Sequence, residues 1–169
     1  MNSAANGDDL WPTVPRLLGD NNYCVLATAN VDGAPWATPV YFAARDDREL
    51  FWVSSPESRH SRNIAIRSAI AITVFDSSAT IGGAEALYLQ ASASALDADL
   101  HTEALAVLNN KLPPRHALDS RDLYPAGPLA VYRATVERHF VLIRGGDPRF
   151  ENVIDQRLEV RRPARERDS

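Results

Sequence analysis

The chain has 169 residues, of which 45% are hydrophobic and 24% are charged, and its formal net charge is −4. This composition is typical of a single globular domain, and the negative charge excludes a broadly basic nucleic-acid-binding surface. Cys24 is the one cysteine, so an internal disulfide is excluded, and no apolar run is long enough to span a membrane. The N-terminus lacks the pattern of a signal peptide, and we therefore expect a cytoplasmic protein with no membrane or nucleic-acid partner.

The N-terminal half is predicted to form a short helix followed by three strands. Residues 1–7 have the composition of a disordered segment, and Asp8 or Asp9 would cap a helix with an apolar face. Asp32-Gly33 supplies the left-handed positions of a tight turn, so the strands on either side of it should form a hairpin. The expected strands cover residues 23–30, 35–44 and 49–53, and the apolar helix face holds Trp11, Val14, Leu17 and Leu18.

The second half of the chain mixes strands with two helices. One helix is expected from Ser58 to Arg67, and a loop containing Gly82-Gly83 follows the strand after it. Apolar spacing predicts a second helix over residues 97–111, which Pro113-Pro114 ends. The expected strands cover residues 69–76, 87–96, 129–136 and 138–143, the last two separated by a bend.

These elements predict a mainly β protein with a few helices. Short connections favour antiparallel pairing of the six or seven strands, and a small closed or split barrel would remove the exposed edges. We assign residues 1–156 to a single domain. Residues 157–169 are rich in arginine and acidic side chains, and we expect them to form a solvated tail that contributes little to folding.

The end of the third expected strand carries the strongest functional signal in the sequence. An apolar strand ends in two serines, and a Pro-Glu-Ser turn leads into a helix start that holds Arg59, His60 and Arg62. Hydroxyls, free helical N–H groups and cations at one strand–helix junction suit a bound phosphate. The alternative is a solvated helix start, with Ser58 serving only as the N-cap.

The order of these motifs resembles the pyridoxamine 5′-phosphate oxidase-related family of FMN-binding split-barrel proteins. The resemblance covers roughly residues 10–143 and depends on the order and spacing of several segments rather than on any one of them. The segments are the Asp32-Gly33 hairpin, Pro35-Trp36-Ala37-Thr38-Pro39-Val40-Tyr41-Phe42, Trp52-Val53-Ser54, Ser58-Arg59-His60-Ser61-Arg62-Asn63-Ile64, Phe75-Asp76 and Leu87-Tyr88-Leu89-Gln90-Ala91.

The resemblance implies a six-stranded antiparallel split β-barrel that works as a homodimer, with FMN bound across the subunit interface. The flavin phosphate would lie against the strand–helix junction, and the isoalloxazine ring along residues 38–41. Arg62 could instead face solvent, and Asn63 could bond the turn backbone. Trp36 and Trp52 could stack on the ring, but a tryptophan in a strand more often belongs to the core. The cofactor-binding residues that the resemblance implies are Thr38, Pro39, Val40, Val53, Ser54, Ser58, Arg59, His60, Arg62 and Asn63.

The sequence departs from the family pattern at positions that define the vitamin oxidase itself. His60 stands where the family commonly has lysine, and a phosphate dianion beside it would favour its charged form. Thr38 stands where the oxidase has arginine, and Ala86-Leu87-Tyr88 stands where the oxidase has a Gln-Val-Arg segment. Classical pyridoxamine phosphate oxidase activity is therefore not expected.

No side chain stands out as catalytic. His101, His116 and His139 lack the spacing of metal ligands, and the sequence holds no phosphate loop and no Ser-His-Asp arrangement. Scarce acid–base residues fit a flavin enzyme, in which the cofactor supplies the redox chemistry. We expect an FMN-dependent oxidoreductase that transfers hydride between the flavin and a small organic substrate, with a nicotinamide nucleotide as a candidate reductant. The alternatives are a deazaflavin-dependent oxidoreductase and a non-catalytic protein that binds flavin or haem.

Overall fold

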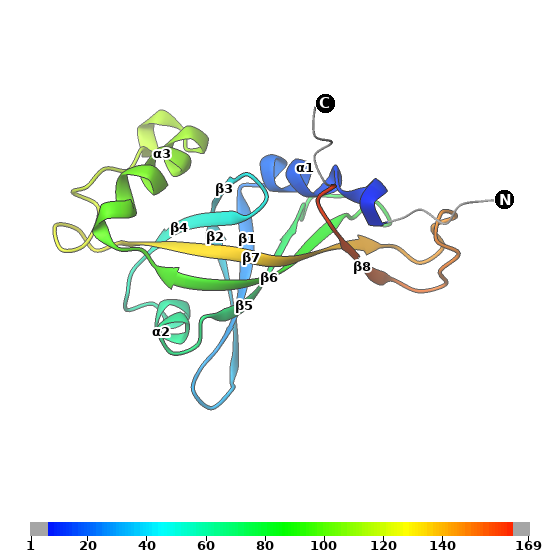
Figure 1. Ribbon diagram of the computed structural model, residues 1–169, viewed down its shortest axis with the longest axis horizontal. Coiled ribbons are helices and arrows are strands. Elements are labelled where there is room, and N and C mark those ends of the chain that lie inside the picture. The colour runs from blue at the N-terminus through cyan, green and yellow to red at the C-terminus, as the bar shows by residue number, and fades with distance from the viewer. Residues whose placement is uncertain (1–6, 164–169) are drawn as a thin grey trace, which may run out of the picture.

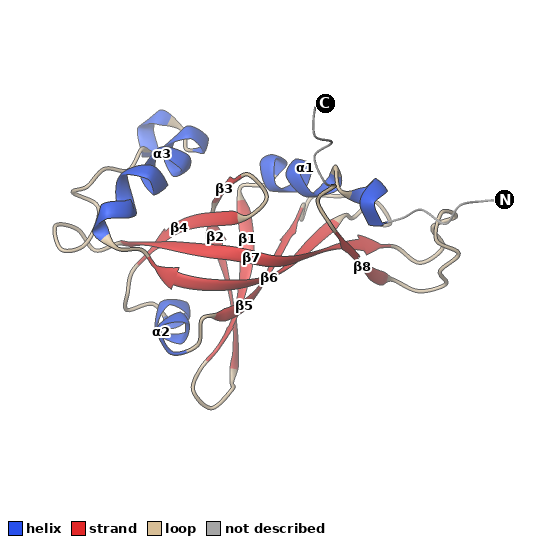
Figure 2. Ribbon diagram, viewed as in Figure 1, coloured by secondary structure: helices blue, strands red, loops and turns tan. Residues whose placement is uncertain are grey.

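The structure is a computed structural model that describes residues 7–163. Residues 1–6, where most of the expected disordered N-terminal segment falls, and residues 164–169 lie outside the described residues. The described part is one curled antiparallel sheet with helices around its rim (Figures 1 and 2). The strands are β1 (Tyr23–Ala29), β2 (Pro35–Tyr41), β3 (Ala43–Arg45), β4 (Glu49–Ser54), β5 (Ala69–Phe75), β6 (Ala86–Ala95), β7 (Ala130–Ile143) and β8 (Gln156–Val160), and the helices are α1 (Thr13–Asp20), α2 (Arg59–Ile66) and α3 (His101–Lys111).

The two end strands of the curled sheet follow one another in the sequence. Its strand order is β2-β1-β5-β6-β7-β4-β3, and β8 pairs with the second half of β7. β2 and β3 lie at opposite ends of this order, yet Phe42 alone separates them in the chain. β2 also touches β4 without pairing with it. The fold is therefore a split β-barrel, as the sequence predicts, and it is open along a seam between β2 and β4.

The inside of the barrel and the space beneath α3 form two apolar cores. Leu26, Trp52 and Leu89 are almost completely buried inside the barrel. Because side chains alternate along a strand, Phe51 on β4 faces the other way and packs in the same cluster as Leu108 of α3. The apolar side chains of β4 therefore face either the barrel or α3.

Helix α1 lies across one end of the barrel (Figure 1) and starts later than the sequence predicts. A 3-10 turn occupies Gly7–Leu10, so the N-cap position of α1 is Pro12 rather than Asp8 or Asp9. A proline fits at this start because its missing N–H would have no helical acceptor there. Three of the four residues of the predicted apolar face, Val14, Leu17 and Leu18, are buried on α1, whereas Trp11 precedes the helix and is half-buried.

The outer face of β2, β1 and β5 is apolar. Residues directly opposite one another in an antiparallel pair lie on the same face, and Ala37, Ala27 and Ala71 line up in this way across the three strands. All three are exposed, as are the larger outer-face side chains Tyr23 (62%) and Phe75 (43%). No outer-face position of these three strands carries a charged residue. The described chain thus has an exposed apolar surface on the outer side of β2, β1 and β5.

The strands differ from the expected ones in number and length. The strand expected over residues 35–44 is interrupted at Phe42, where the chain leaves β1 and begins to pair with β4 as β3. The two strands expected after residue 129 are one strand, β7, in which Glu137 is the extra residue of a bulge. With β8 included, the sheet has eight strands in the described residues, rather than the six that the family resemblance implies.

Part of the expected solvated tail is the strand β8. It pairs with β7 over His139–Ile143, and Val160 is almost completely buried. Arg138 and Glu159 form an ion pair across the two strands, with 2.6 Å between Nη2 and Oε2. The segment is therefore a paired strand with charged side chains on its outer side, and the expectation of a solvated chain from residue 157 is wrong up to Val160.

Candidate functional site

Helix α2 begins directly after the turn that follows β4. Ser58 is its N-cap, and the Ser58 hydroxyl accepts a hydrogen bond from the Ser61 amide at 3.3 Å. The Ser58 amide donates to the Ser55 carbonyl at 3.0 Å, which closes the turn. The backbone N–H groups of Arg59 and His60 have no acceptor among the described residues. The predicted cap is thus confirmed, and two N–H groups remain free at the start of the helix.

His60 is turned into the protein rather than toward solvent. It is 6% exposed, and its Nε2 lies 2.9 Å from the Ser54 hydroxyl. The Ser58 hydroxyl lies 3.2 Å from each of the two ring nitrogens. Burial lowers the pKa of His60 below its ordinary value, because the charged imidazolium loses hydration. At this junction His60 is therefore a neutral hydrogen-bonding group near pH 7.

The two arginines of the junction have different partners. Arg59 is exposed, and its Cζ lies 4.2 Å from the centre of the Trp36 ring on β2. Arg62 faces Glu57, with 3.8 Å between Nη1 and Oε2, and both of these side chains are largely exposed. An exposed ion pair of this kind contributes little free energy. Among the described residues no carboxylate pairs with Arg59, so its guanidinium keeps its N–H groups available.

Asn63 has a structural role. It is 4% exposed, and its Nδ2 donates to the Thr28 hydroxyl of β1 at 2.9 Å. The Thr28 hydroxyl in turn donates to the Trp36 carbonyl of β2 at 3.3 Å. This buried chain of hydrogen bonds fixes α2 against both strands of the hairpin. The partner of Asn63 is thus a strand side chain, not the turn backbone that the sequence suggested.

The predicted residues of β2 and β4 do not share one face. Thr38 faces the barrel, because it lies opposite a buried residue of β1, and its Oγ1 is buried without a hydrogen-bond partner in the described structure. Pro39 lies on the outer face, and Val40 is buried in the barrel core. Val53 packs beneath α3, on the side of β4 opposite to Ser54. The structure thus brings Thr38 to the barrel side of β2 and separates the side chains of Pro39 and Val53 from it.

Two tryptophans near the seam are placed differently from each other. Trp52 is fully buried and stacks on Tyr132 with 5.6 Å between ring centres, as expected of a core residue, but its Nε1 has no partner in the described structure. Trp36 is 41% exposed, so the core assignment is wrong for it. The sequence could have indicated this exposure, because Trp36 directly follows the first residue of β2. It therefore lies close to the Gly33 turn, where a hairpin extends beyond the core.

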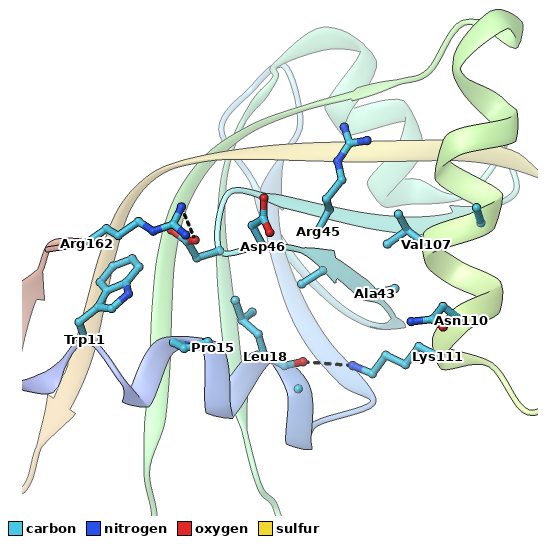
Figure 3. Close-up of a pocket in the computed structure, with 14 residues that line it drawn as sticks. Trp11, Pro15, Leu18, Ala43, Arg45, Asp46, Val107, Asn110, Lys111 and Arg162 are labelled. Carbon is cyan, nitrogen blue, oxygen red and sulfur yellow. Dashed lines mark hydrogen bonds and ion pairs between the residues drawn. The ribbon is translucent and has the colours of Figure 1, made fainter. Parts of the chain in front are cut away.

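A cavity of about 830 Å³ lies away from this junction, between α1, α3 and the β3–β4 turn (Figure 3). All of its charged groups except Asp46 have a partner among the described residues. Arg162 pairs with Asp47 at 3.3 Å, and Lys111 Nζ donates to the carbonyls of Leu18 and Asn21 at the end of α1. Burial lowers the pKa of Lys111. None of the predicted site residues lines this cavity, and the β4–α2 junction remains the candidate site.

The junction offers hydroxyls, an imidazole and a guanidinium, all of which can hydrogen-bond an anion. Within residues 7–163, no group of three or more His, Cys, Asp or Glu side chains could hold a metal ion. No helix of the described chain is long and apolar enough to cross a membrane.

Comparison with known proteins connects this geometry to one family. The family model for pyridoxamine 5′-phosphate oxidase matches residues 10–141. Among solved structures, HutZ, the haem storage protein from Vibrio cholerae, has a TM-score of 0.64 at 20% identity and covers 78% of this chain and 94% of its own. A haem-binding protein from Mycobacterium smegmatis has a TM-score of 0.65 at 18% identity, covering 92% of this chain and 58% of its own. An FAD-binding protein from Mesorhizobium loti has a TM-score of 0.58 at 19% identity, covering 78% of this chain and 92% of its own. At these identities the likeness shows the fold alone. No curated protein matches the chain.

Proposed function

The chain belongs to the pyridoxamine 5′-phosphate oxidase family, and from that membership we propose that it binds FMN and acts as a flavin-dependent oxidoreductase. When bound, the flavin would supply hydride transfer to or from a small organic substrate, while the protein binds and orients it. The observation that carries the proposal is the convergence of Ser54, Ser58, Arg59 and His60 at one strand–helix junction beside β2.

The junction fits a phosphate group in the donors it offers. The N–H groups of Arg59 and His60 are free at the start of α2, where the helix dipole favours an anion. The Arg59 guanidinium adds a charge-assisted donor without an acidic partner. His60 holds the hydroxyls of Ser54 and Ser58 beside this helix start. A phosphate here would accept hydrogen bonds from both backbone and side chains.

The seam beside the junction offers buried polar groups to the ring of the cofactor. The Thr38 Oγ1 and the Trp52 Nε1 are both buried on the barrel side of β2 and β4 and lack partners in the described structure. A buried polar group without a partner costs free energy. A ligand that enters the seam and supplies those partners would remove that cost. We therefore expect the ring of the cofactor to lie along β2 at Thr38.

We also propose that two copies of the chain associate through the outer face of β2, β1 and β5. Exposed apolar patches of this kind are characteristic of protein interfaces. The small side chains of Ala37, Ala27 and Ala71 let the same face of a second copy approach closely, and the flanking Tyr23 and Phe75 supply apolar area. Because α2 packs against β1 and β2, such an interface would lie beside the candidate site.

The test is the visible absorption spectrum of the purified protein, before and after addition of FMN and then of a nicotinamide nucleotide. We expect an oxidised flavin spectrum that bleaches on reduction and returns with a suitable acceptor. Thr38 and the Ala86-Leu87-Tyr88 segment argue against the vitamin itself as substrate, so pyridoxamine phosphate serves as the negative control. A protein that binds no flavin would contradict the proposal.

A second candidate function is haem binding without turnover. It is favoured by the haem-related names of the Vibrio cholerae and Mycobacterium smegmatis neighbours. The Arg59 guanidinium would suit a propionate as well as a phosphate, since both are anionic oxygen acceptors. In the same experiment, a haem spectrum in place of a flavin spectrum would favour this candidate, and a deazaflavin spectrum would favour the deazaflavin-dependent alternative.

A further inference from the structure

The candidate phosphate subsite has fewer available charges than its sequence suggests. The sequence places three basic residues in the first turn of α2. His60 is buried against serine hydroxyls, and Arg62 faces Glu57. Arg59 is left as the one cation of this turn that has no acidic or hydrogen-bonded partner in the described structure. Because the exposed Arg62–Glu57 pair is weak, Arg62 still adds positive charge nearby, but Arg59 is the guanidinium of this turn whose N–H groups are all free to bind an anion.

The position of that guanidinium is set by a residue of a different element. The Cζ of Arg59 lies 4.2 Å from the centre of the Trp36 ring, and Trp36 belongs to β2. An exposed arginine without a partner samples many rotamers, and contact with an indole face restricts them. A guanidinium that stacks on an aromatic face keeps its planar set of N–H groups free to donate. Trp36 thus holds Arg59 in place without using its donors.

The backbone of Trp36 is fixed relative to α2 by a separate set of contacts. The buried Asn63 amide of α2 donates to the Thr28 hydroxyl, which donates to the Trp36 carbonyl. The indole contacts Arg59 at the beginning of the same helix. Trp36 is thus linked to α2 in two ways, directly through its ring and indirectly through its carbonyl by way of the Thr28 hydroxyl.

We propose that Trp36 is the positioning residue for the phosphate of the bound cofactor. Trp36 belongs to β2, the strand along which we expect the ring of the cofactor to lie. By holding Arg59, Trp36 makes this strand contribute to the affinity for the phosphate as well. This inference rests on the proposed function, because it takes the anion to be the phosphate of FMN.

The test compares FMN with riboflavin, which lacks the phosphate. The dissociation constants of both would be measured by flavin fluorescence for the full chain and for W36L, W36F, R59A and the double variant W36L/R59A. The ratio of the riboflavin constant to the FMN constant isolates the phosphate contribution. We expect W36L to lower this ratio about two- to fivefold, which corresponds to the about 0.5–1 kcal/mol of an exposed cation–π contact. W36F keeps an aromatic face and should retain most of the ratio, and W36L/R59A should match R59A because the two residues act through one contact.

A matched control comes from a second arginine–aromatic pair away from the junction. Arg138 lies 4.8 Å from the centre of the Phe140 ring on β7, so F140L removes a comparable contact and should leave the ratio unchanged. If W36L does not fold, Trp36→Thr, which has high strand propensity, serves in the same comparison.

The outcomes separate the two proposals. A wild-type protein that binds FMN no better than riboflavin would refute the phosphate part of the proposed function. A wild-type preference that R59A abolishes but W36L retains would overturn only the role of Trp36. Equal weakening of both ligands by W36L would also overturn it, since a purely structural residue supports the ring and the phosphate alike.

Discussion

Truncation of the chain after Gln156 removes all but the first residue of β8. The main loss is Val160, which is 2% exposed within the barrel core, and burial of such a side chain contributes about 1.5–3 kcal/mol. Each lost hydrogen bond to β7 contributes about 0.5–1.5 kcal/mol, but ordering the backbone costs a similar amount per residue, so the two largely cancel. The buried Asp47 carboxylate also loses its partner Arg162. We expect the free energy of unfolding to fall by about 2–3 kcal/mol, or about 4–12 °C in melting temperature for a domain of this size.

Thermal unfolding followed by circular dichroism measures this change. The matched control is truncation after Pro163, which retains β8, Arg162 and every contact described here, and it should melt close to the full chain. The reasoning is refuted if truncation after Gln156 leaves the melting temperature unchanged. It is also refuted if both truncations lower the melting temperature equally, because the loss would then come from residues 164–169.

Three further predictions concern α2 and the outer face. Asn63→Ala breaks a buried hydrogen bond, so it should lower the free energy of unfolding, measured in urea, by about 1–3 kcal/mol with or without flavin. An effect seen only with flavin bound would contradict the structural role of Asn63. Ala71→Glu places a charge at the centre of the apolar outer face and should give a monomer by sedimentation, whereas a persistent dimer would locate the interface elsewhere. Because the folded pKa of His60 is lowered below its ordinary value of 6.5, the unfolded chain binds the proton more readily, and the free energy of unfolding should fall as the pH drops from about 7 to about 5. His60→Gln should lack that part of the fall, and identical pH profiles would count against it.

The position of the candidate site was predictable from local signals, but the directions of its side chains were only partly so. Ser58 and the turn before it specify a helix start from nearby residues alone. His60 lies four residues before the buried Ile64, so helical periodicity would have placed it on the inner face. The contact between Arg59 and Trp36 joins residues that are distant in the sequence, and no local pattern indicates it.

The contrast between local signals and contacts distant in the sequence also explains which strands were predictable. The hairpin at Gly33 has its partners within a few residues, and its turn chemistry alone indicates the pairing. The sequence of β8 is typical of a charged, solvated segment. Whether its acidic and basic side chains face water or pair with other residues depends on the strand opposite, which the sequence of β8 does not indicate. Glu159 of β8 pairs with Arg138 of β7. The bulge at Glu137 in β7 is the reason that the sequence predicted two strands there instead of one.

Phe42 gives the split barrel a fixed pivot. It is fully buried and joins the two end strands of the sheet, so the two edges of the seam cannot separate at that point. Any widening must therefore grow with distance from Phe42, and Trp36 lies six positions away along β2, about 20 Å in an extended strand. Ser54 lies at the end of β4 that leads into α2. Helix α2 closes the seam at that end, because Asn63 bonds it to Thr28 of the hairpin, so a rotation about Phe42 could open the seam there only by breaking this hydrogen bond, although every strand pairing would stay intact.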